Sequence, residues 1–471
     1  MANPGVYAKE IPTSISTPAA ASFGVPFVVG TAPFHTAEKP AKANTPVLCS
    51  SWDEAVSKLG YSDDWSTYTL CEFMYSHFQL YSCRPVVFCN VLDGKASKTM
   101  ESETPFTVAE HQVKLPEETM RDGLKVSTTA DTPVTLVEDT DYSAFHDGGF
   151  LVVELLEDGA AYDAKELKIE GKMLDVSQVT ETEIVKGLGQ IDSCMTKTGL
   201  VPDLICCPGW SHKSAVAAIM AARAQSINGL FAAKALIDAD CEAVEDYSGI
   251  SEWKNKNSIV DTNEILCWPK VKLGDKVFHL STQLAGRMAL TDLGNDGIPY
   301  ESPSNKPLKI DGTVGADGEE IDITFDQSKV LSAAGCLTAI NFMDQGWTLR
   351  NNYTACYPGN TDVKDQFIPV SRMFDYVGKT VIRTFWSKLD RPLNKTLLDN
   401  VVNTCENRLG GLVSAGALLG ARITAEAEEN PLTRLLDGVI TFHIYMTPPV
   451  PAQEILFNLE FDPAYLESAL S

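Results

Sequence analysis

The sequence predicts a multidomain protein of mixed α/β and α+β class. Its predicted parts are an α/β core, an inserted small all-β domain, and an α+β C-terminal domain with terminal strands that are either exchanged between subunits or folded back onto their own chain. Two observations predict the first parts: strand and helix patterns alternate up to residue 92 and again from residue 182, and the residues between them follow period-two patterns. A third observation predicts the C-terminal domain: two long helical patterns and two strand patterns follow residue 350.

These patterns divide the 471 residues into regions, and the length suits about three domains. Residues 1–20 are rich in Pro, Ser and Ala and hold too few apolar side chains to pack alone, so we expect an N-terminal linking arm. The α/β core is expected at 21–92 plus 182–350, the inserted β domain at 93–181, and the C-terminal domain at 351–471. A second linking arm is expected from about residue 447.

The core elements follow from buried apolar runs and helix caps. Ser51 begins a helix as its N-cap, with Glu54 three residues later and Gly60 after its end. The strands expected in the core are Val25–Thr31, Pro85–Leu92, Asp203–Cys207 and Ile265–Lys272. The helices expected there are Ser51–Leu59, Leu70–Tyr81, Thr182–Thr198, Ser211–Arg223 and Gln327–Gln345.

The inserted and C-terminal regions are predicted in the same way. Pro133–Val137 and Phe150–Leu156 are expected strands, and the turn at Asp147–Gly149 joins the second to Tyr142–Phe145 as a hairpin. The C-terminal domain is expected to hold the helices Asp365–Lys388 and Pro392–Val413 and the strands Gly438–Met446 and Glu454–Asp462.

Charge and cysteine content restrict the function class. The net charge of −25 argues against nucleic acid as a partner and against an anionic membrane surface, since both require a basic surface. We see no signal peptide, targeting motif or apolar span, so no direct membrane insertion is expected. The twelve cysteines are scattered without a CxxC pair, which favours free buried thiols over a disulfide framework or a zinc site.

The sequence contains no recognisable catalytic, metal-binding or cofactor-binding motif. Gly378-Lys379-Thr380 is not a phosphate loop, because Met373 stands where that motif needs its first glycine. The seven histidines are single and widely spaced, so no metal triad is expected. One enzymatic alternative remains, a cysteine-dependent hydrolase that uses Cys206 or Cys207 as nucleophile and His212 as base.

The two ends of the chain are the distinctive feature. Each holds a strand-like, proline-flanked segment joined to the rest by an extended linker. An unpaired strand can be satisfied by adding to the sheet of a neighbouring subunit. The alternative is that both segments fold back onto the sheet of their own chain.

The ordered motifs of the chain resemble those of contractile tail sheath proteins. The resemblance covers nearly the whole chain apart from about 93–181, a place where sheath proteins commonly carry decorating domains. The motifs are Pro4–Glu10, Gly24–Thr31, Pro202–Gly209, Ala285-Gly286 with Asp292, Gly297, Pro299 and Ser302–Asn305, then Gly346–Thr354, Gly416–Gly420, Asn430-Pro431, Gly438 and Pro448–Ile455.

The resemblance implies a structural, non-enzymatic subunit of a phage tail, a phage-tail-like bacteriocin or a related injection machine. Such subunits form a helical homopolymer of stacked hexameric rings around an inner tail tube protein and contract to drive the tube through a target envelope. The implied partners are further copies, the tube, baseplate and tail terminator proteins. The implied location is a virion or tail-like particle assembled in the bacterial host cytoplasm. A capsid or baseplate protein with swapped arms is the rival structural hypothesis.

Specific residues are expected to carry this function. In the N-terminal arm they are Val6, Ala8 and Glu10, and in the C-terminal arm Ile455, Phe457, Leu459 and Phe461. Arg372, Lys379 and Arg383 are spaced by seven and four, which places them on one face of a helix. A basic face in so acidic a chain suggests a ridge that faces the tube, although a solvated helix face is the alternative.

Overall fold

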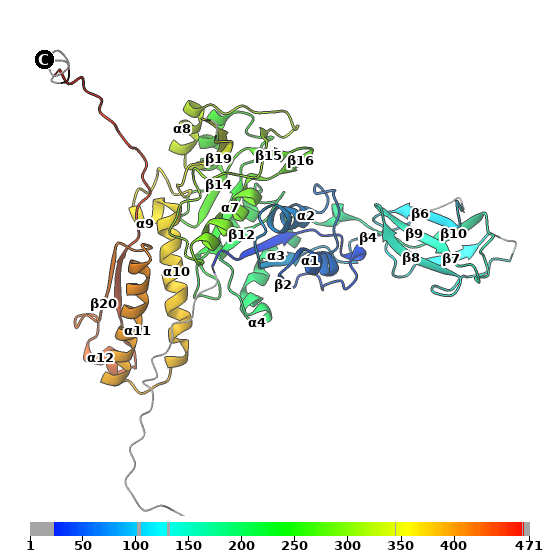
Figure 1. The fold of residues 1–471 in the computed structure, drawn as a ribbon. Coiled ribbons are helices and arrows are strands. Elements are labelled where there is room, and N and C mark those ends of the chain that lie inside the picture. Colours follow the sequence, from blue (N-terminus) through cyan, green and yellow to red (C-terminus); the bar gives the residue numbers. More distant parts are fainter. Residues whose placement is uncertain (1–22, 101–104, 130–131, 344, 464, 466–471) are drawn as a thin grey trace, which may run out of the picture.

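An eight-stranded sheet forms the centre of the computed structural model, which describes residues 23–100, 105–129, 132–343, 345–463 and 465 (Figure 1). The strand order is β19-β18-β14-β13-β12-β1-β3-β2. The inner strands run parallel, and the edge strands β2 and β19 run antiparallel to their neighbours. These strands are β1 (Pro26–Gly30), β2 (Val47–Cys49), β3 (Val86–Asn90), β12 (Leu204–Cys206), β13 (Lys234–Asp238), β14 (Glu264–Cys267), β18 (Cys336–Asn341) and β19 (Trp347–Arg350).

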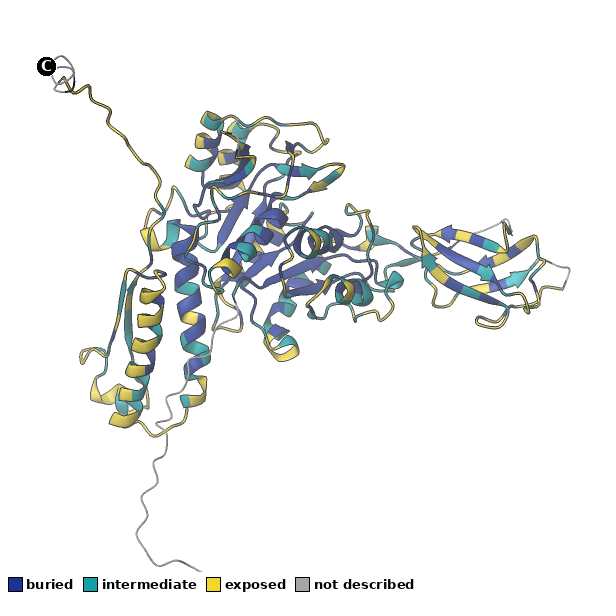
Figure 2. Cartoon of the chain, in the orientation of Figure 1, coloured by how far each residue is buried: buried dark blue, intermediate teal, exposed yellow. Residues whose placement is uncertain are grey.

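Helices cover both faces of this sheet, as a parallel sheet requires. Every residue of β1, β3 and β13 is buried. β1 and most of β3 appear in the sequence as continuous apolar runs, whereas β13 has an apolar centre between Lys234 and Asp238. One face packs against α3 (Glu181–Leu188), α5 (Ser214–Gln225), α6 (Ile250–Lys256) and α8 (Phe325–Ala333). The other packs against α1 (Trp52–Leu59), α2 (Thr69–Met74) and α7 (Leu280–Gly294), which leaves the dark interior seen in Figure 2.

Local signals located several helix ends correctly. Ser51 caps α1 by accepting a hydrogen bond from the Glu54 backbone N–H at 3.2 Å, and Gly60 ends the helix at φ 75°. The predicted helix 70–81 is present, but after α2 it continues as a π-helical turn over Tyr75–Leu80. The predicted helix 182–198 is interrupted, since a 3₁₀ turn (Gly189–Ser193) separates α3 from α4 (Cys194–Thr198).

Two of the predicted core elements are wrong in part. The helix expected over 327–345 ends at Ala333, and Cys336–Asn341 forms the buried strand β18 instead. Gly335 lies between them at φ 72°, a conformation that disfavours other residues, so the chain can turn there from helix into sheet. The strand expected over 265–272 divides at Pro269 into β14 and β15 (Lys270–Leu273), which belong to different sheets.

Gly286 allows α7 to approach the π-helical turn and its following residue, Tyr81. A Cβ at Gly286 would lie 2.3 Å from the Tyr81 ring, and Tyr81 cannot move freely because its hydroxyl donates to Gln283 Oε1 at 2.8 Å. We therefore expect Gly286→Ala to destabilise the protein by about 1–3 kcal/mol, measured by urea denaturation. Gly294→Ala is the matched control on the same helix, because nothing lies within 4 Å of its added Cβ. An equal effect of the two substitutions would contradict the packing argument.

Residues 97–174, here called the β segment, project from the α/β body between β3 and α3 (Figure 1). They form two three-stranded antiparallel sheets, β6-β9-β8 and β5-β10-β7, around an apolar cluster of their own, and the pair β4–β11 forms the neck. The strands are β4 (Ser97–Thr99), β5 (Phe106–Thr107), β6 (Gln112–Pro116), β7 (Lys125–Thr128), β8 (Tyr142–Asp147), β9 (Phe150–Leu155), β10 (Glu166–Glu170) and β11 (Lys172–Leu174).

The predicted hairpin is confirmed within the β segment. β8 and β9 pair through a two-residue turn in which Gly148 and Gly149 take φ 55° and 78°, as a tight hairpin turn requires. The strand expected at 133–137 is wrong, since Thr135 forms only a single bridge with Ser127. Outside the β segment, a separate three-stranded sheet, β16-β15-β17, lies on the α/β body and adds β16 (Lys276–Phe278) and β17 (Gly312–Val314) to β15.

The C-terminal part of the chain packs beside the body as two long helices and a two-stranded sheet. α10 (Ile368–Phe385) and α11 (Lys395–Ser414) confirm the two predicted helices. β20 (Gly420–Thr424) and β21 (His443–Thr447) pair antiparallel, so the strand expected over 438–446 is shorter than predicted. The short helices α9 (Val363–Gln366) and α12 (Leu432–Leu436) complete this part.

Candidate assembly surfaces

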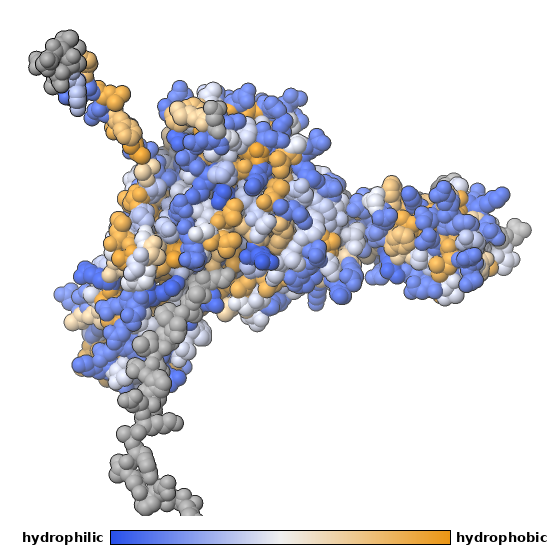
Figure 3. Space-filling model, in the orientation of Figure 1, coloured by the Kyte–Doolittle hydropathy of each residue, from blue (hydrophilic) through white to orange (hydrophobic). Residues whose placement is uncertain are grey.

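The C-terminal segment extends away from the body (Figure 1). Its apolar side chains are exposed to solvent. Residues 448–462 hold no regular secondary structure, so the strand expected over 454–462 is absent from the single chain. The exposed fractions are 71% for Ile455, 83% for Phe457, 95% for Leu459 and 82% for Phe461, and Figure 3 shows the apolar stretch of this segment. A lone chain supplies no neighbouring strand at this position, which explains why the strand is absent.

The arm leaves the body at a defined point. The Gln453 amide donates to Asn352 Oδ1 at 3.0 Å, directly before the exposed apolar residues begin. The preceding residues, Thr447–Ala452, include three prolines, which favour an extended, stiff link. Residues 454–462 span about 30 Å when extended, so the arm is long enough to reach well beyond its own body.

An apolar groove of about 800 Å³ lies between α10, α11 and the chain leading into β21. It is lined by Phe385, Leu389, Leu397, Val401, Ile440 and Phe442, among others. β20 and β21 form a sheet of two strands, so within the described residues each has one edge without a strand partner. The groove and the free edge of β21 together are able to accept an extended apolar peptide.

The period-two pattern of residues 439–446 sets which side chains enter the groove. Ile440, Phe442 and Ile444 line it, whereas Val439 and Tyr445 are exposed. The sequence predicted this alternation correctly, even though regular strand pairing begins only at His443. The same alternation recurs in the arm at 455, 457, 459 and 461.

The basic face predicted on α10 points into the protein, so a solvent-exposed ridge is wrong for Arg372 and Lys379. Their side chains are only 1% and 3% exposed. Arg372 forms a bidentate pair with Asp292 of α7, with one contact of 3.0 Å, and Lys379 Nζ lies 2.6 Å from Asp203 Oδ1. Arg383, one turn further along, is half-buried. The spacing identified a shared face correctly but carried no information about which way that face points.

A third buried pair completes this seam between α10 and the body. Lys234 of β13 lies 3.1 Å from Asp375 Oδ2 and also donates to Ser371 Oγ at 2.7 Å. Burial raises the pKa of Asp203, Asp292 and Asp375 and lowers the pKa of Lys379. Desolvation therefore offsets much of the attraction, and these pairs fix the position of α10 more than they add net stability.

The root of the N-terminal region is held at the same seam. The Phe23 ring lies 5.2 Å from the Arg372 guanidinium and 5.4 Å from Lys379 Nζ, and it packs edge-on against Tyr376 at 5.5 Å. The Val25 N–H donates to Asp203 Oδ2 at 3.1 Å. The predicted N-arm residues Val6, Ala8 and Glu10 precede this root and lie outside the described residues.

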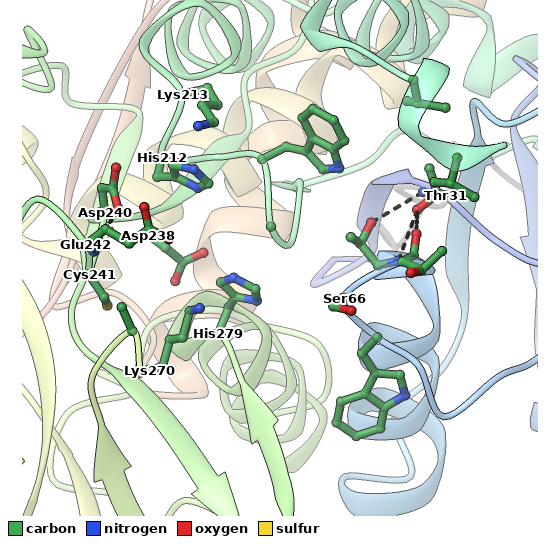
Figure 4. A pocket seen from close by; sticks show the side chains of 18 of the residues that line it. Thr31, Ser66, His212, Lys213, Asp238, Asp240, Cys241, Glu242, Lys270 and His279 are labelled. Atoms are coloured by element: carbon green, nitrogen blue, oxygen red, sulfur yellow. Dashed lines mark hydrogen bonds between the residues drawn. The ribbon is translucent and has the colours of Figure 1, made fainter. Parts of the chain in front are cut away.

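A polar cleft of about 530 Å³ lies where β1, β12 and β13 end (Figure 4). His212, Asp238 and His279 line it; Asp238 is held by the Ser211 and Ser281 hydroxyls, and His279 Nδ1 lies 2.8 Å from Glu72 Oε2. Cys206 and Cys207 are fully buried and are not among the lining residues, and burial raises the pKa of both thiols. A thiol nucleophile needs the opposite environment, so the geometry disfavours the cysteine hydrolase.

Sequence reasoning missed the carboxylates that pair with α10. Asp203 directly precedes the wholly buried strand β12, and Asp292 lies in the buried part of α7. An acidic residue beside a continuous apolar run is the signal that indicates a buried ion pair, because an unpaired buried carboxylate is very costly.

Among the described residues, no helix combines enough length and apolarity to cross a membrane.

The chain is similar in sequence to known tail sheath proteins over most of its length. It is 23% identical over 460 residues to the tail sheath protein of Burkholderia phage BcepMu, covering 93% of this chain and 92% of the relative. It is 24% identical over 369 residues to a putative prophage major tail sheath protein of Pseudomonas aeruginosa, covering 74% of this chain and 90% of the relative. The chain is therefore similar to tail sheath proteins along most of its length. No family model matches the sequence.

Solved sheath structures share the fold of this chain. The helical sheath of the anti-feeding prophage in its contracted state aligns with a TM-score of 0.59 and 15% identity, over 98% of this chain and all of that chain. The contracted sheath complex of an extracellular contractile injection system aligns with a TM-score of 0.58 and 13% identity, over 99% of both chains. The mixed α/β multidomain architecture of this chain is therefore similar to that of solved sheath subunits.

Proposed function

We propose that this chain, as a sheath subunit, polymerises as stacked rings around an inner tube and contracts to drive the tube through a target cell envelope. The observation that carries the proposal is the exposed C-terminal arm, in which Leu459 is 95% exposed. Leaving four large apolar side chains in water is unfavourable, by about 1.5–3 kcal/mol for each relative to burial. An assembly in which every arm is covered by a neighbour removes this cost, and the names of the sheath relatives support such an assembly.

The arm of one copy is proposed to lie along the free edge of β21 in the next copy. There Ile455, Phe457, Leu459 and Phe461 would enter the apolar groove beside Ile440 and Phe442. Main-chain hydrogen bonds add about 0.5–1.5 kcal/mol each, and because several would form together in one docked strand they would keep the arm in place while the bodies rotate. The bodies would then pivot at the two ends of the stiff link 447–452, which act as hinges for this rotation.

The other regions take proposed roles consistent with this lattice. The arm at 1–20, with Val6, Ala8 and Glu10, would add a second exchanged strand. The inserted β domain at 93–181 would project from the core formed by 21–92 and 182–350, and the C-terminal domain at 351–471 would carry the exchanged strands. The β domain holds 20 acidic and 8 basic residues, about half of the net charge of −25, which would repel indiscriminate association before assembly.

The remaining partners follow from the family. The inner tube would contact the C-terminal domain, where Arg383 stays a candidate while Arg372 and Lys379 are occupied by buried carboxylates. Baseplate and terminator proteins would contact the two ends of the polymer, in a virion or tail-like particle assembled in the host cytoplasm. The energy for contraction would be stored in the lattice at assembly, without a catalytic site, metal or bound nucleotide.

Electron microscopy of the purified protein tests the proposed function directly. We expect long hollow cylinders in negative stain, formed by the protein alone or with its tube protein. Monodisperse globular particles under all conditions, with or without the tube protein, would contradict a sheath. Closed icosahedral shells would instead favour the rival capsid hypothesis.

A further inference from the structure

Two histidines meet where the β segment contacts the α/β body. His35 belongs to the 3₁₀ turn Phe34–Thr36 of the body, and His146 belongs to β8 of the β segment. His35 Nε2 lies 2.7 Å from the Glu117 carbonyl oxygen, and His146 Nε2 lies 3.1 Å from the Thr119 carbonyl oxygen. A carbonyl oxygen only accepts, so each Nε2 donates its proton and each Nδ1 is bare in the neutral ring. Both histidines thus hold the same loop in their neutral form.

This contact has no place for an additional proton. His35 Nδ1 is buried, and among the described residues it has no hydrogen-bond partner. The hydroxyl groups of Tyr68 and Thr119 are likewise buried and unpartnered. The two imidazole rings lie 5.1 Å apart at 83°, so protonating both would place two positive charges side by side. A proton on His35 Nδ1 would also be a buried donor without an acceptor, which is costly.

Ionisable groups surround the histidine pair on both sides of the contact. The body contributes Tyr68, Asp63 and Asp64, and the β segment contributes Glu117, Glu118 and Arg121. Ser62 Oγ donates to the Glu117 carboxylate at 3.4 Å, and burial raises the pKa of Glu117. Protonation of Glu117 in acid therefore removes a buried negative charge and stabilises the closed contact. This opposes protonation of the histidines, which destabilises the closed contact.

Burial sets the direction of the histidine response. It lowers the pKa of His35 from 6.5 to about 4, and it lowers the pKa of His146 as well. A histidine whose pKa is lower in the closed contact than in the open one stabilises the closed contact when the ring is neutral. The stabilisation is therefore complete above pH 6.5 and is lost as the pH falls from 6.5 towards 4.

We propose that this contact is an acid-sensitive latch, which holds the β segment against the body at neutral pH and releases it to move about its β4–β11 neck in acid. The proposal does not depend on sheath function, because both sides of the latch belong to one chain. Histidine pairs that must be neutral in one conformation are a general means of making a contact respond to pH.

A buried reporter thiol in the full-length protein tests the latch. Thr119→Cys is close to isosteric, and Thr119 is 0% exposed, so its thiol reacts with a disulfide reagent only when the contact opens. The rate is divided by that of the exposed Glu157→Cys in a separate variant at the same pH, which cancels the reagent's own pH dependence. The native cysteines are buried and report any global unfolding. We expect the normalised rate to rise roughly 15-fold from pH 6.5 to 5 through the titration of His35 alone, because the pKa of that group is 6.5 when free and about 4 in the closed contact.

Variants in the Thr119→Cys background separate the histidines from other groups. Gln keeps an N–H donor but does not titrate, so His35→Gln and His146→Gln should each flatten the rise. Glu117→Gln should steepen it, because the opposing carboxyl is removed. His111→Gln is the matched control, since His111 lies on the far side of the β segment against Tyr162 and should leave the rise intact. A flat rate from pH 7.5 to 5 in the parent, or an unchanged rise in both latch variants, would overturn the proposal.

Discussion

Removal of residues 454–471 is expected to abolish cylinder formation while leaving a folded subunit. The deletion removes the exposed apolar side chains of the arm from Ile455 onward, yet it keeps Gln453 and its hydrogen bond to Asn352 at the root. These side chains touch little of their own body, so their loss should hardly change the stability of the single chain. Assembly is measured by negative-stain microscopy and sedimentation, and folding by circular dichroism. Cylinders of normal length from the truncated chain would contradict a role for the arm.

A pair of point variants separates the apolar face of the arm from its charge and length. Leu459→Asp places a carboxylate on the face proposed to enter the groove, where burying an unpaired charge costs several kcal/mol. Asn458→Asp adds the same charge one residue away, on the face expected to stay in water. We expect the first variant to remain unassembled and the second to form cylinders. Equal assembly of the two would show that the alternation at 455–461 does not determine docking.

Arg372→Met is expected to destabilise the folded chain by about 3–5 kcal/mol, because it leaves Asp292 buried without its cation. The variant keeps most of the side-chain volume, so the effect isolates the charge. It also removes the guanidinium that lies 5.2 Å from the Phe23 ring. The measurement is the free energy of unfolding from urea denaturation of the full chain at pH 7.

Two further variants make this prediction specific. Arg383→Met removes a basic side chain from the same helix at a half-buried position and should change stability by no more than about 0.5 kcal/mol. The double variant Arg372→Met with Asp292→Leu removes both buried charges and should regain most of the lost stability, since desolvation offsets much of the attraction in this pair. If Arg372→Met were as mild as Arg383→Met, the carboxylate would have to be solvated in the folded protein.

Local signals were sufficient wherever one stretch of chain determines its own structure. The Ser51 cap, the glycine turn at 148–149 and the helices at 368–385 and 395–414 were all predicted, because caps, turns and helical periodicity depend on neighbouring residues. The error at 327–345 has a similar local origin. A helix followed by a buried apolar strand gives one continuous apolar pattern, and only Gly335 marks the change.

The features of the assembly surfaces likewise fall into those that are visible in the sequence and those that arise only in the folded protein. The alternation in the arm and in residues 440–446 was visible in the sequence, because period two is a property of any extended segment. The groove was not visible, since residues from α10, α11 and the chain before β21 meet there only in the folded protein. The absence of a strand at 454–462 has the same cause, because a strand needs a neighbour to pair with.

The sequence by itself determined the class of the protein, its helix caps and turns, and the extended apolar character of its C-terminal end. Only the tertiary structure decided the direction of the basic face on α10. Spacing states which side chains share a face, but the carboxylates that neutralise that face lie 80 residues away at Asp292 and 176 residues away at Asp203. A charge is buried or exposed according to what the fold brings against it, and that information is not local.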